Sequence, residues 1–453
     1  MKLLSKRAVV VLILSLLLVA GLLTFTVKYV MNASSWAMYP TNRHLYTEGK
    51  LVVSGTIYDR GGEVLAQTIK GKKQYHKNIT VRKALMHAIG DSNGNVVTGA
   101  QAAFRDRLSG WSLLNGTYHA GTSAHDLTLT LDADLCAVAY NALNGRKGTV
   151  GVYNYKTGEI LCMVSTPTFD PEVPPNVGKN PELYEGVYIN RFLSATYTPG
   201  SVFKLVTAAA AIENIKNIDT KVYHCDGKLE IGGQLVTCPL AHGNVTLESA
   251  LAESCNVAFA HISLELGGTT LQKYADTAGF NSSLEVDGIK TAMGKVNVAD
   301  AEGGDLAWAG IGQYSDLANP LNFLTYVGAI ANDGVRITPR LLMDDGLFTT
   351  FLRGTKRVLS EDTAGTVKNM MRNNVINAYG EGNYSGLKMG AKSGTAEVGG
   401  DQKPHAWFAG FLDREDCPLA FVVVIENGGS GSKVAGPIAA KVLQTAVKSM
   451  TKE

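Results

Sequence analysis

The amino-acid sequence predicts an α+β fold. Its pattern consists of a β-hairpin, a helical block, two further β-rich runs and a final helix, at residues 149–164, 201–214, 406–412, 419–426 and 438–450. The hairpin is indicated by two β-rich runs that meet at the turn Lys156-Thr157-Gly158. Blocks of strands and helices in this order differ from the strict alternation that predicts a doubly wound sheet.

The region before the hairpin has a mixed pattern. A strand-like run at 51–58 is followed by the turn Asp59-Arg60-Gly61-Gly62, and helices are expected at 81–89 and 132–143, with a strand at 127–131 between them. With 453 residues, 45% of them apolar, the chain is long enough for more than one domain. We therefore place a domain boundary near residue 145.

The first thirty residues predict a membrane anchor. Residues 8–27 carry no charge, and as a helix they span about 30 Å, the thickness of a hydrocarbon core. A cleaved signal peptide is the alternative, but its apolar region is about 7–15 residues long and precedes a small-residue cleavage site. The run here is longer and is followed by Lys28 and Tyr29. Lys2, Lys6 and Arg7 predict a cytoplasmic N-terminus and a catalytic region outside the membrane.

The chain contains four Ser-x-x-Lys sequences, the arrangement that places a lysine base beside a serine nucleophile on one helix face. They begin at Ser201, Ser385, Ser430 and Ser449. Only Ser201 opens a predicted helix, directly after Pro199-Gly200, and its partner is Lys204. A helix N-terminus also favours developing negative charge. By itself this segment favours the simpler interpretation, in which Ser201 is only an N-cap and Lys204 is a solvated side chain.

Two further segments strengthen the case for Ser201. A neutral lysine base needs burial or a second positive charge nearby, and Lys392, in a stretch of small residues that ends with Thr395, is a candidate for that charge. The sequence Lys156-Thr157-Gly158 is a decoy that the hairpin turn explains. Ser254-Cys255-Asn256 is the sole Ser-x-Asn in the chain and falls between the other two motifs. Taken alone, it predicts no more than a helix N-cap.

Together the motifs resemble a known family. Ser-x-x-Lys at 201–204, Ser-x-Asn at 254–256 and Lys-Ser-Gly at 392–394, in this order, resemble the signature of penicillin-binding proteins and serine β-lactamases. Residues 148–170 resemble the opening of the transpeptidase domain. Residues 56–66 resemble the pedestal motif of class B penicillin-binding proteins. The resemblance covers most of the chain outside the predicted anchor.

The resemblance implies a fold and a domain organisation. The expected fold is an antiparallel sheet flanked by helices, with an all-helical lobe. The expected organisation is a cytoplasmic tail, a transmembrane anchor, a pedestal for dimerisation or interaction, and a transpeptidase domain, at residues 1–7, 8–30, 31–145 and 146–453. The pedestal is too short for a glycosyltransferase domain, so a bifunctional class A enzyme is not expected.

The resemblance also implies roles for the reacting residues. Ser201 attacks the D-alanyl-D-alanine carbonyl of a peptidoglycan stem peptide, and Lys204 takes its proton. Ser254 relays a proton to the leaving group, and Asn256 binds the substrate amide. Lys392 sets the local electrostatic field.

The substrate contacts are expected on the strand that follows Lys392. By the same resemblance, Ser393 and Thr395 hold the terminal carboxylate, with Gly394 between them in the substrate-binding segment. The backbone N–H groups of Ser201 and Thr395 form the oxyanion hole, where each donor is worth about 3–4 kcal/mol.

The expected function is a peptidoglycan D,D-transpeptidase that forms a serine acyl-enzyme, is inactivated by β-lactams and works with a membrane glycosyltransferase partner. No cofactor is expected. No nucleic-acid partner is expected either, because the formal net charge is only +2 and the basic residues are scattered. Two alternatives remain open. A D,D-carboxypeptidase or β-lactamase shares the motifs and uses water as the acceptor. A non-enzymatic β-lactam sensor or scaffold is the other.

Six cysteines occur, and two of them flank a predicted hairpin with Gly232-Gly233 at its turn. A disulfide between Cys225 and Cys238 is one interpretation, in keeping with an extracytoplasmic domain. A zinc site that uses both thiols and either His224 or His242 is the rival, although the spacing matches no strong zinc pattern. Two free thiols are the third interpretation. The remaining cysteines, at 136, 162, 255 and 417, are interpreted as small buried side chains.

Overall fold

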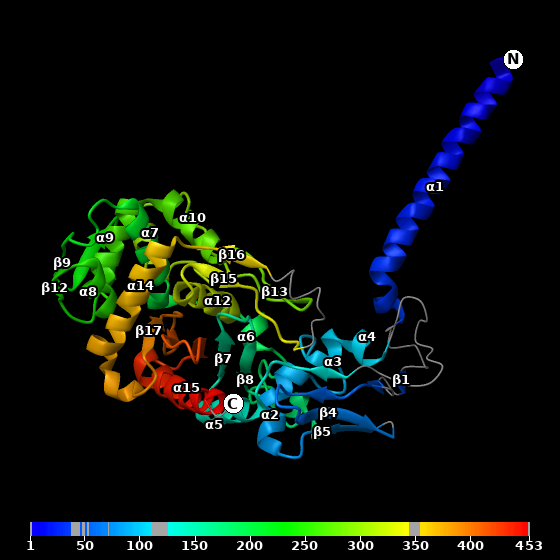
Figure 1. Cartoon of the computed structure of the whole chain (residues 1–453). Helices are drawn as coiled ribbons and strands as arrows, with labels where there is room; N and C mark the ends of the chain where they lie inside the picture. Colours follow the sequence, from blue (N-terminus) through cyan, green and yellow to red (C-terminus); the bar gives the residue numbers. More distant parts are fainter. Residues whose placement is uncertain are drawn as a thin grey trace.

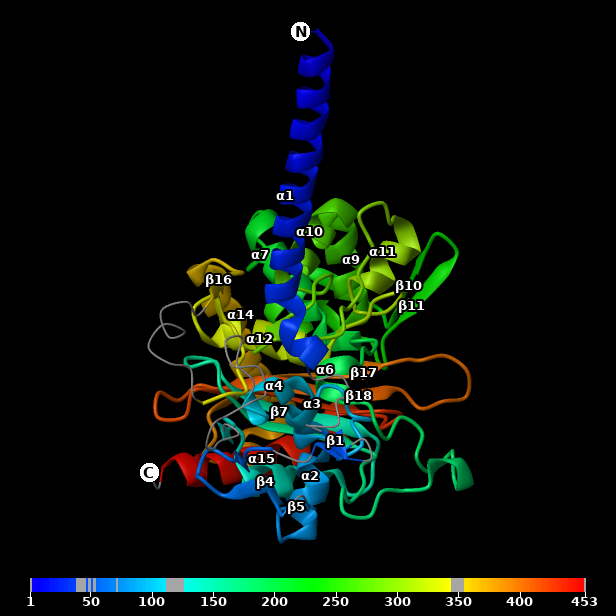
Figure 2. The ribbon, with the colours of Figure 1, turned by 90° about the vertical axis from the view of Figure 1, so that its right-hand side faces the viewer.

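The computed structural model describes most of the chain, in the ranges 2–37, 46–47, 50–51, 54–70, 72–110, 126–343 and 354–451. Helix α1 (Lys2–Ala37) stands apart from the rest of the protein (Figures 1 and 2). Its segment Lys6–Ala33 is long and apolar enough to cross a membrane, and no part of its most apolar stretch is buried in the described structure. Such a helix suits a lipid environment, because all its backbone hydrogen bonds are internal.

The region after α1 is built on a small mixed sheet. Within the residues described, its strand order is β5-β4-β3-β6, with β3 and β6 parallel and the other pairs antiparallel. The turn between β3 and β4 forms at Asp59, whose Oδ1 accepts hydrogen bonds from the N–H groups of Gly61 and Glu63 at 2.9 and 2.7 Å. The elements are β1 (Tyr46–Thr47), β2 (Lys50–Leu51), β3 (Ile57–Tyr58), β4 (Val64–Ile69), β5 (Lys72–Tyr75), α2 (Ile79–Ile89), α3 (Ala100–Ala103), α4 (Arg105–Leu108), β6 (Leu127–Thr128) and α5 (Ala133–Leu143).

The centre of the protein is an antiparallel sheet. In the described part of the chain it has five strands, in the order β17-β18-β19-β7-β8. Their bounds are β7 (Gly148–Asn154), β8 (Ile160–Thr166), β17 (Met389–Ala396), β18 (His405–Leu412) and β19 (Leu419–Ile425). Strands from both ends of the catalytic region are therefore neighbours, and β17 lies at the edge.

Helices cover both faces of this sheet (Figure 1). Helices α5 and α15 (Gly436–Met450) pack on one face, and α12 (Pro320–Ala331) and α6 (Arg191–Ser194) pack on the other. Every residue of β7, β8 and β19 is buried as a result. This explains why these strands appear in the sequence as continuous apolar runs rather than as alternating ones.

A helical lobe packs beside the sheet. Its helices are α7 (Lys204–Asn214), α8 (Leu247–Ala252), α9 (Asn256–Leu266), α10 (Gly268–Ala278), α11 (Gly303–Ala309) and α14 (Glu361–Asn373). Helix α7 lies at its centre, in contact with α9, α10 and α14. Each residue from Lys204 to Ala211 is buried, and the alanines there let neighbouring helices approach closely.

Short elements connect these layers. The hairpins and small paired strands are β9 (Tyr223–Cys225) with β12 (Gly243–Val245), β10 (Lys228–Ile231) with β11 (Gln234–Thr237), β13 (Glu285–Val286) with β14 (Ile289–Lys290), and β15 (Val335–Ile337) with β16 (Thr355–Arg357). The short helical turns are η1 (Val177–Lys179), η2 (Gly200–Val202), η3 (Asn374–Gly380), η4 (Glu381–Tyr384) and η5 (Gly431–Ala435).

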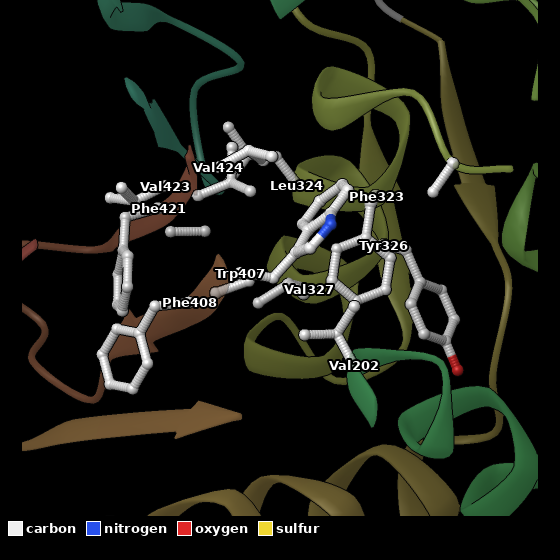
Figure 3. Close-up of a cluster of buried hydrophobic side chains, with 14 of the residues drawn as sticks. Val202, Phe323, Leu324, Tyr326, Val327, Trp407, Phe408, Phe421, Val423 and Val424 are labelled. Atoms are coloured by element: carbon white, nitrogen blue, oxygen red, sulfur yellow. The ribbon is translucent and has the colours of Figure 1, made fainter. Parts of the chain in front are cut away.

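The core beneath the sheet edge is aromatic. Trp407 on β18 packs edge-to-face on Phe323 of α12, with ring centroids 5.9 Å apart (Figure 3). The Trp407 indole N–H donates to the carbonyl of Thr198 at 3.0 Å. Val202 of η2 lies in the same cluster (Figure 3). The sheet, α12 and the turn before α7 are thus held together at one point.

The predicted α+β fold is confirmed, and so are most of its elements. The helices expected at 81–89 and 132–143 are α2 and α5, and the expected hairpin is β7–β8. The run at 51–58 is not one strand: β2 ends at Leu51 and β3 begins at Ile57, and residues 52–53 lie outside the described ranges. The domain boundary near residue 145 stays a prediction. Helix α5, which lies just before it in the chain, packs on β8 and α15.

Candidate active site

Ser201 lies in a tight turn before the long helix of the lobe. The turn η2 is a 3₁₀-helix, and α7 begins only at Lys204. In 3₁₀ geometry the side chains at i and i+3 are eclipsed, so Ser201 and Lys204 face the same way. The turn starts at Gly200 with a φ of +57°, a conformation that glycine adopts without the cost other residues incur.

The turn packs directly on the edge strand β17. A Cβ on Gly200 would lie 2.8 Å from the Thr395 carbonyl oxygen. Conversely, a Cβ on Gly394 would lie 2.9 Å from the Pro199 carbonyl oxygen and 3.0 Å from Val202. At both glycines these distances are too short for a side chain. Two glycines therefore permit the backbone bearing Ser201 and the backbone at 394–395 to touch.

Lys204 is completely buried, and its ammonium group points at the Ser-x-Asn segment. Its Nζ donates to the Ser254 carbonyl at 2.7 Å, to Asn256 Oδ1 at 2.7 Å and to Ser254 Oγ at 3.2 Å. The Asn256 amide nitrogen in turn donates to the carbonyl of Thr237 at 2.7 Å. Lys204 is thus fixed by three oxygens, while Ser201 Oγ has no hydrogen-bond partner among the described residues.

Lys392 approaches the same serine from the opposite side. It is fully buried on β17, and its Nζ donates to Ser254 Oγ at 3.0 Å and to the Ser393 carbonyl at 3.0 Å. The Ser254 hydroxyl therefore bridges two lysines that are 188 residues apart in the chain. Ser254 itself has a φ of +57°, an uncommon conformation for a residue other than glycine, of the kind that clusters at functional sites.

The two lysines have no carboxylate partner in the described part of the chain. Neither Nζ lies within ion-pair distance of a described carboxylate, and the hydrogen-bond partners of both are neutral oxygens. Burial lowers the pKa of Lys204 to about 7. Burial, and then the charge of Lys204, lower the pKa of Lys392 well below its usual value. Because two adjacent buried cations are costly, burial and mutual repulsion favour the neutral form of one of the two lysines.

The open edge of β17 presents backbone N–H groups on the side away from β18. The Ser393 N–H donates to the hydroxyl of Tyr379 at 2.8 Å, so it points away from β18. Alternation along a strand directs the N–H of Thr395, two residues on, to the same open edge. The Tyr379 hydroxyl also donates to Ser393 Oγ at 3.0 Å. Thr395 is exposed at this edge and Gly394 is buried between the two.

The structure brings together all the residues expected to react or bind substrate and separates them from the decoys. Lys156 lies in the β7–β8 turn, where its N–H donates to Asn154 Oδ1. Ser385 is exposed after η4, Ser430 precedes the turn η5 rather than an α-helix, and Ser449 is in the last turns of α15. Ser430 is the N-cap residue of the π-helical turn that contains Lys433, but none of these three serines opens an α-helix that carries its lysine.

Tyr379 was not predicted from the sequence. It lies in the π-helical turn η3, in a stretch with no motif, and it is placed beside Ser393 by packing on Phe408, with ring centroids 5.5 Å apart. Asn374 in the same turn donates to the carbonyl of Ala391 at 3.0 Å. Only the tertiary structure reveals that η3 supports β17.

The cysteine interpretation needs a correction. The Sγ atoms of Cys225 and Cys238 are 3.8 Å apart, and all six cysteines, which lie within the described ranges, are free thiols. A disulfide needs about 2.05 Å, so the structure does not contain the predicted bridge. Cys255, interpreted from the sequence as a small buried side chain, instead joins both thiols and His242 in one cluster.

Comparison with known proteins identifies the family. The penicillin-binding protein transpeptidase domain matches residues 148–444. The peptidoglycan D,D-transpeptidase PbpA of Mycolicibacterium smegmatis is 26% identical over 98% of this chain and 99% of its own length.

Solved structures agree in fold. The D,D-transpeptidase domain of a peptidoglycan glycosyltransferase from Eggerthella lenta is similar with a TM-score of 0.75 and 28% identity, over 87% of this chain and 98% of that one. Penicillin-binding protein A of M. tuberculosis, as a ceftriaxone acyl-enzyme complex, has the same TM-score and coverage at 23% identity. The chain belongs to the penicillin-binding protein transpeptidase family.

The contacts of Tyr379 predict a measurable role. Tyr379→Phe removes the hydroxyl that pairs with both the N–H and the Oγ of Ser393, leaving a buried N–H without its partner, at a cost of about 1–3 kcal/mol. We expect the rate of acylation by a fluorescent penicillin to fall about tenfold.

Tyr384→Phe is the matched control. Tyr384 packs on the same Phe408 ring at 5.7 Å, but its hydroxyl forms no hydrogen bond within the described structure. It should acylate at the wild-type rate. Equal rates for both variants would show that Tyr379 contributes packing alone.

Proposed function

We propose that this chain is a serine D,D-transpeptidase that cross-links peptidoglycan stem peptides and is inactivated by β-lactams. The observation that carries the proposal is a pair of buried lysines on either side of Ser254, next to the turn that bears Ser201 and with no carboxylate partner among the described residues. A structural lysine pair would be expected to carry carboxylate partners. A pair that shares one proton beside a serine hydroxyl suits proton transfer in acyl transfer.

We assign one step of acylation to each of these groups. Lys204 in its neutral form takes the proton of Ser201 as Oγ bonds to the carbonyl carbon of the penultimate D-alanine. Negative charge on the carbonyl oxygen is stabilised by the N–H groups of Ser201 and Thr395. Ser254, hydrogen-bonded to both lysines, passes a proton to the departing nitrogen as the C–N bond to the terminal D-alanine breaks. Asn256 holds the substrate amide.

The substrate carboxylate is assigned to the edge of β17. Ser393 and Thr395 supply hydroxyl groups there, and Lys392, whose Nζ binds the Ser393 carbonyl, lies beside them. The acyl-enzyme is then resolved by the amine of a second stem peptide. Its nitrogen bonds to the acyl carbon, the ester to Ser201 breaks, and the proton returns through the same groups.

We assign the rest of the chain to delivery. Residues 1–7 form a cytoplasmic tail, 8–30 the membrane anchor, 31–145 a pedestal and 146–453 the catalytic domain. The apolar segment of α1 and the basic residues in the first turns of that helix support this topology. In the pedestal, Arg82 of α2 binds the carboxylate of Asp170 through Nε and a terminal nitrogen, at 2.8 and 2.7 Å. That ion pair joins pedestal and catalytic domain. A membrane glycosyltransferase is the proposed partner.

Penicillin labelling tests the nucleophile and its base. Ser201→Ala should abolish covalent labelling by a fluorescent penicillin, and Lys204→Ala should abolish it almost as fully, because nucleophile and base act as one unit. Ser385→Ala, which alters an exposed serine in another Ser-x-x-Lys sequence, should label like the wild type. A wild-type chain that takes no label, with Ser201→Ala behaving identically, would exclude the enzyme assignment and favour a non-enzymatic role. Labelling of Ser201→Ala at the wild-type level would remove Ser201 as the nucleophile.

The pH dependence tests the shared proton. Acylation needs a neutral lysine, and the pKa of Lys204 is lowered to about 7 by burial. The neutral form gains as pH rises, so the acylation rate constant should increase through about pH 7 and level off above it. Stopped-flow acylation between about pH 5.5 and 8.5 measures this. A rate that is flat over that range would remove the lysine pair as the base.

The acceptor is the point on which the alternatives differ. Incubation with a D-Ala-D-Ala pentapeptide and an excess of a D-amino acid should yield the exchanged peptide, because an amine resolves the acyl-enzyme. Mass spectrometry separates this product from the tetrapeptide that water would release. Tetrapeptide alone would identify a D,D-carboxypeptidase. Rapid turnover of penicillin itself would identify a β-lactamase.

A further inference from the structure

Four side chains converge at one point behind the Ser-x-Asn segment. The Sγ atoms of Cys225, Cys238 and Cys255 and a ring nitrogen of His242 all lie within 4.8 Å of one another. They come from the end of β9, the residue after β11, the loop before β12 and the N-cap of α9. Cys225 and Cys255 are buried, and the His242 side chain is only 4% exposed.

The spacing of these atoms matches a tetrahedral zinc site. With Zn–S bonds of about 2.3 Å and Zn–N bonds of about 2.0–2.1 Å, tetrahedral angles place two sulfurs about 3.8 Å apart and a sulfur and a nitrogen about 3.5 Å apart. The sulfur of Cys238 lies 3.8 Å from that of Cys225 and 3.9 Å from that of Cys255. Cys225 Sγ lies 3.4 Å from His242 Nδ1.

The surroundings suit metal-bound thiolates. Cys238 Sγ accepts hydrogen bonds from the N–H groups of Asn256 and Val257 at 3.1 and 3.4 Å, and Cys255 Sγ accepts one from Ala258 at 3.3 Å. These donors belong to the first turn of α9, where N–H groups have no intrahelical acceptor and favour negative charge.

The histidine is oriented as a ligand. With Nδ1 toward Cys225, the other nitrogen of His242 lies 3.8 Å from a Glu253 carboxylate oxygen, the kind of outer carboxylate that zinc-bound imidazoles commonly face. His224, the other candidate from the sequence, is exposed and binds Asn244 and Asp226. The structure thus selects His242 and adds Cys255.

We propose that Cys225, Cys238, His242 and Cys255 bind one structural Zn²⁺ ion that holds the Ser-x-Asn segment in place. Three thiolates and one imidazole form a closed four-ligand set, which is the composition of structural rather than catalytic zinc sites. A disulfide between any two of the thiols would use up two ligands and leave the third thiol and the imidazole without the partner that their convergence indicates.

The metal would act on the active site through two short connections. Cys255 lies between Ser254 and Asn256, so fixing its sulfur fixes the carbonyl and the amide oxygen that hold Lys204. Thr237, next to Cys238, accepts the hydrogen bond from the Asn256 amide. The positive φ of Ser254 is a conformation that needs such restraint. Zinc binding itself does not depend on the proposed reaction. The coupling between the zinc site and catalysis does rest on the proposed function.

Metal analysis of the purified full-length chain in detergent tests the site directly. Inductively coupled plasma mass spectrometry should find about one zinc per chain, with intact mass showing six free thiols after denaturation in an alkylating agent. Cys255→Ser is the sharpest variant, because serine is a good N-cap and preserves the capping of α9 while removing the thiolate. It should hold zinc at least about a hundredfold more weakly.

Matched variants distinguish the proposed zinc ligands from nearby residues of the same type that do not bind the metal. His242→Ala should lose zinc, whereas His224→Ala, an exposed histidine nearby, should retain it. Cys136→Ala, a buried cysteine outside the cluster, should also retain it. If Cys255→Ser fails to fold, the histidine pair still decides the outcome. Zinc content that is unaffected by His242→Ala and Cys255→Ser would overturn the site, as would a wild-type chain that neither contains zinc nor takes it up.

Penicillin acylation then tests the coupling. Removal of zinc by a chelator should lower the melting temperature and slow acylation at least about tenfold, and added ZnCl₂ should restore both. A chain that binds zinc but acylates equally fast without it would overturn the coupling and leave the site intact. Failure of the proposed enzyme function is a separate result: absence of labelling in the zinc-loaded wild type.

Discussion

The candidate active site depends on the burial of two lysines against a single serine hydroxyl, with no carboxylate from the described residues to neutralise them. Lys204 and Lys392 come from the central helix of the lobe and from the edge of the sheet, and Ser254 comes from a loop between them. Each lysine would be more stable in water or beside an acid. The surrounding fold keeps them together, and the cost of two adjacent buried charges is what holds one of them neutral. The chemical result is a neutral lysine, which can accept a proton.

The topology of the sheet makes this meeting possible. The strand that carries Lys392 comes late in the chain, yet the order β17-β18-β19-β7-β8 leaves it at the edge, beside the turn that bears Ser201. Two glycines, Gly200 and Gly394, remove the side chains that would separate turn and strand. Trp407 anchors the turn from below through the Thr198 carbonyl. The nucleophile is therefore positioned by backbone contact with the strand to which we assign the substrate.

Of the three motifs, the Ser-x-Asn segment depends most on contacts with residues outside the motif. It is a loop end with a positive φ at Ser254, and its two functional oxygens must face Lys204 accurately. Sheet and helix packing hold the other two motifs, but this one is held by the cysteine and histidine cluster and by Thr237. The proposed zinc ion would restrain this loop through four bonds, in addition to the packing of the small hairpins around it. Structure outside the reacting groups thus decides whether they are aligned.

The sequence by itself determined the local features: the apolar anchor, the α+β order of elements, and the Ser201 and Lys204 pair at the start of a helix. These follow from periodicity, turn chemistry and spacing, which act over a few residues. The order of three short motifs was enough for family resemblance. Tertiary structure alone decided that Tyr379 supports Ser393, that Cys255 and His242 join Cys225 and Cys238, and that no disulfide forms between the last two. Such contacts join residues far apart in the chain, and no local pattern records a distance between them.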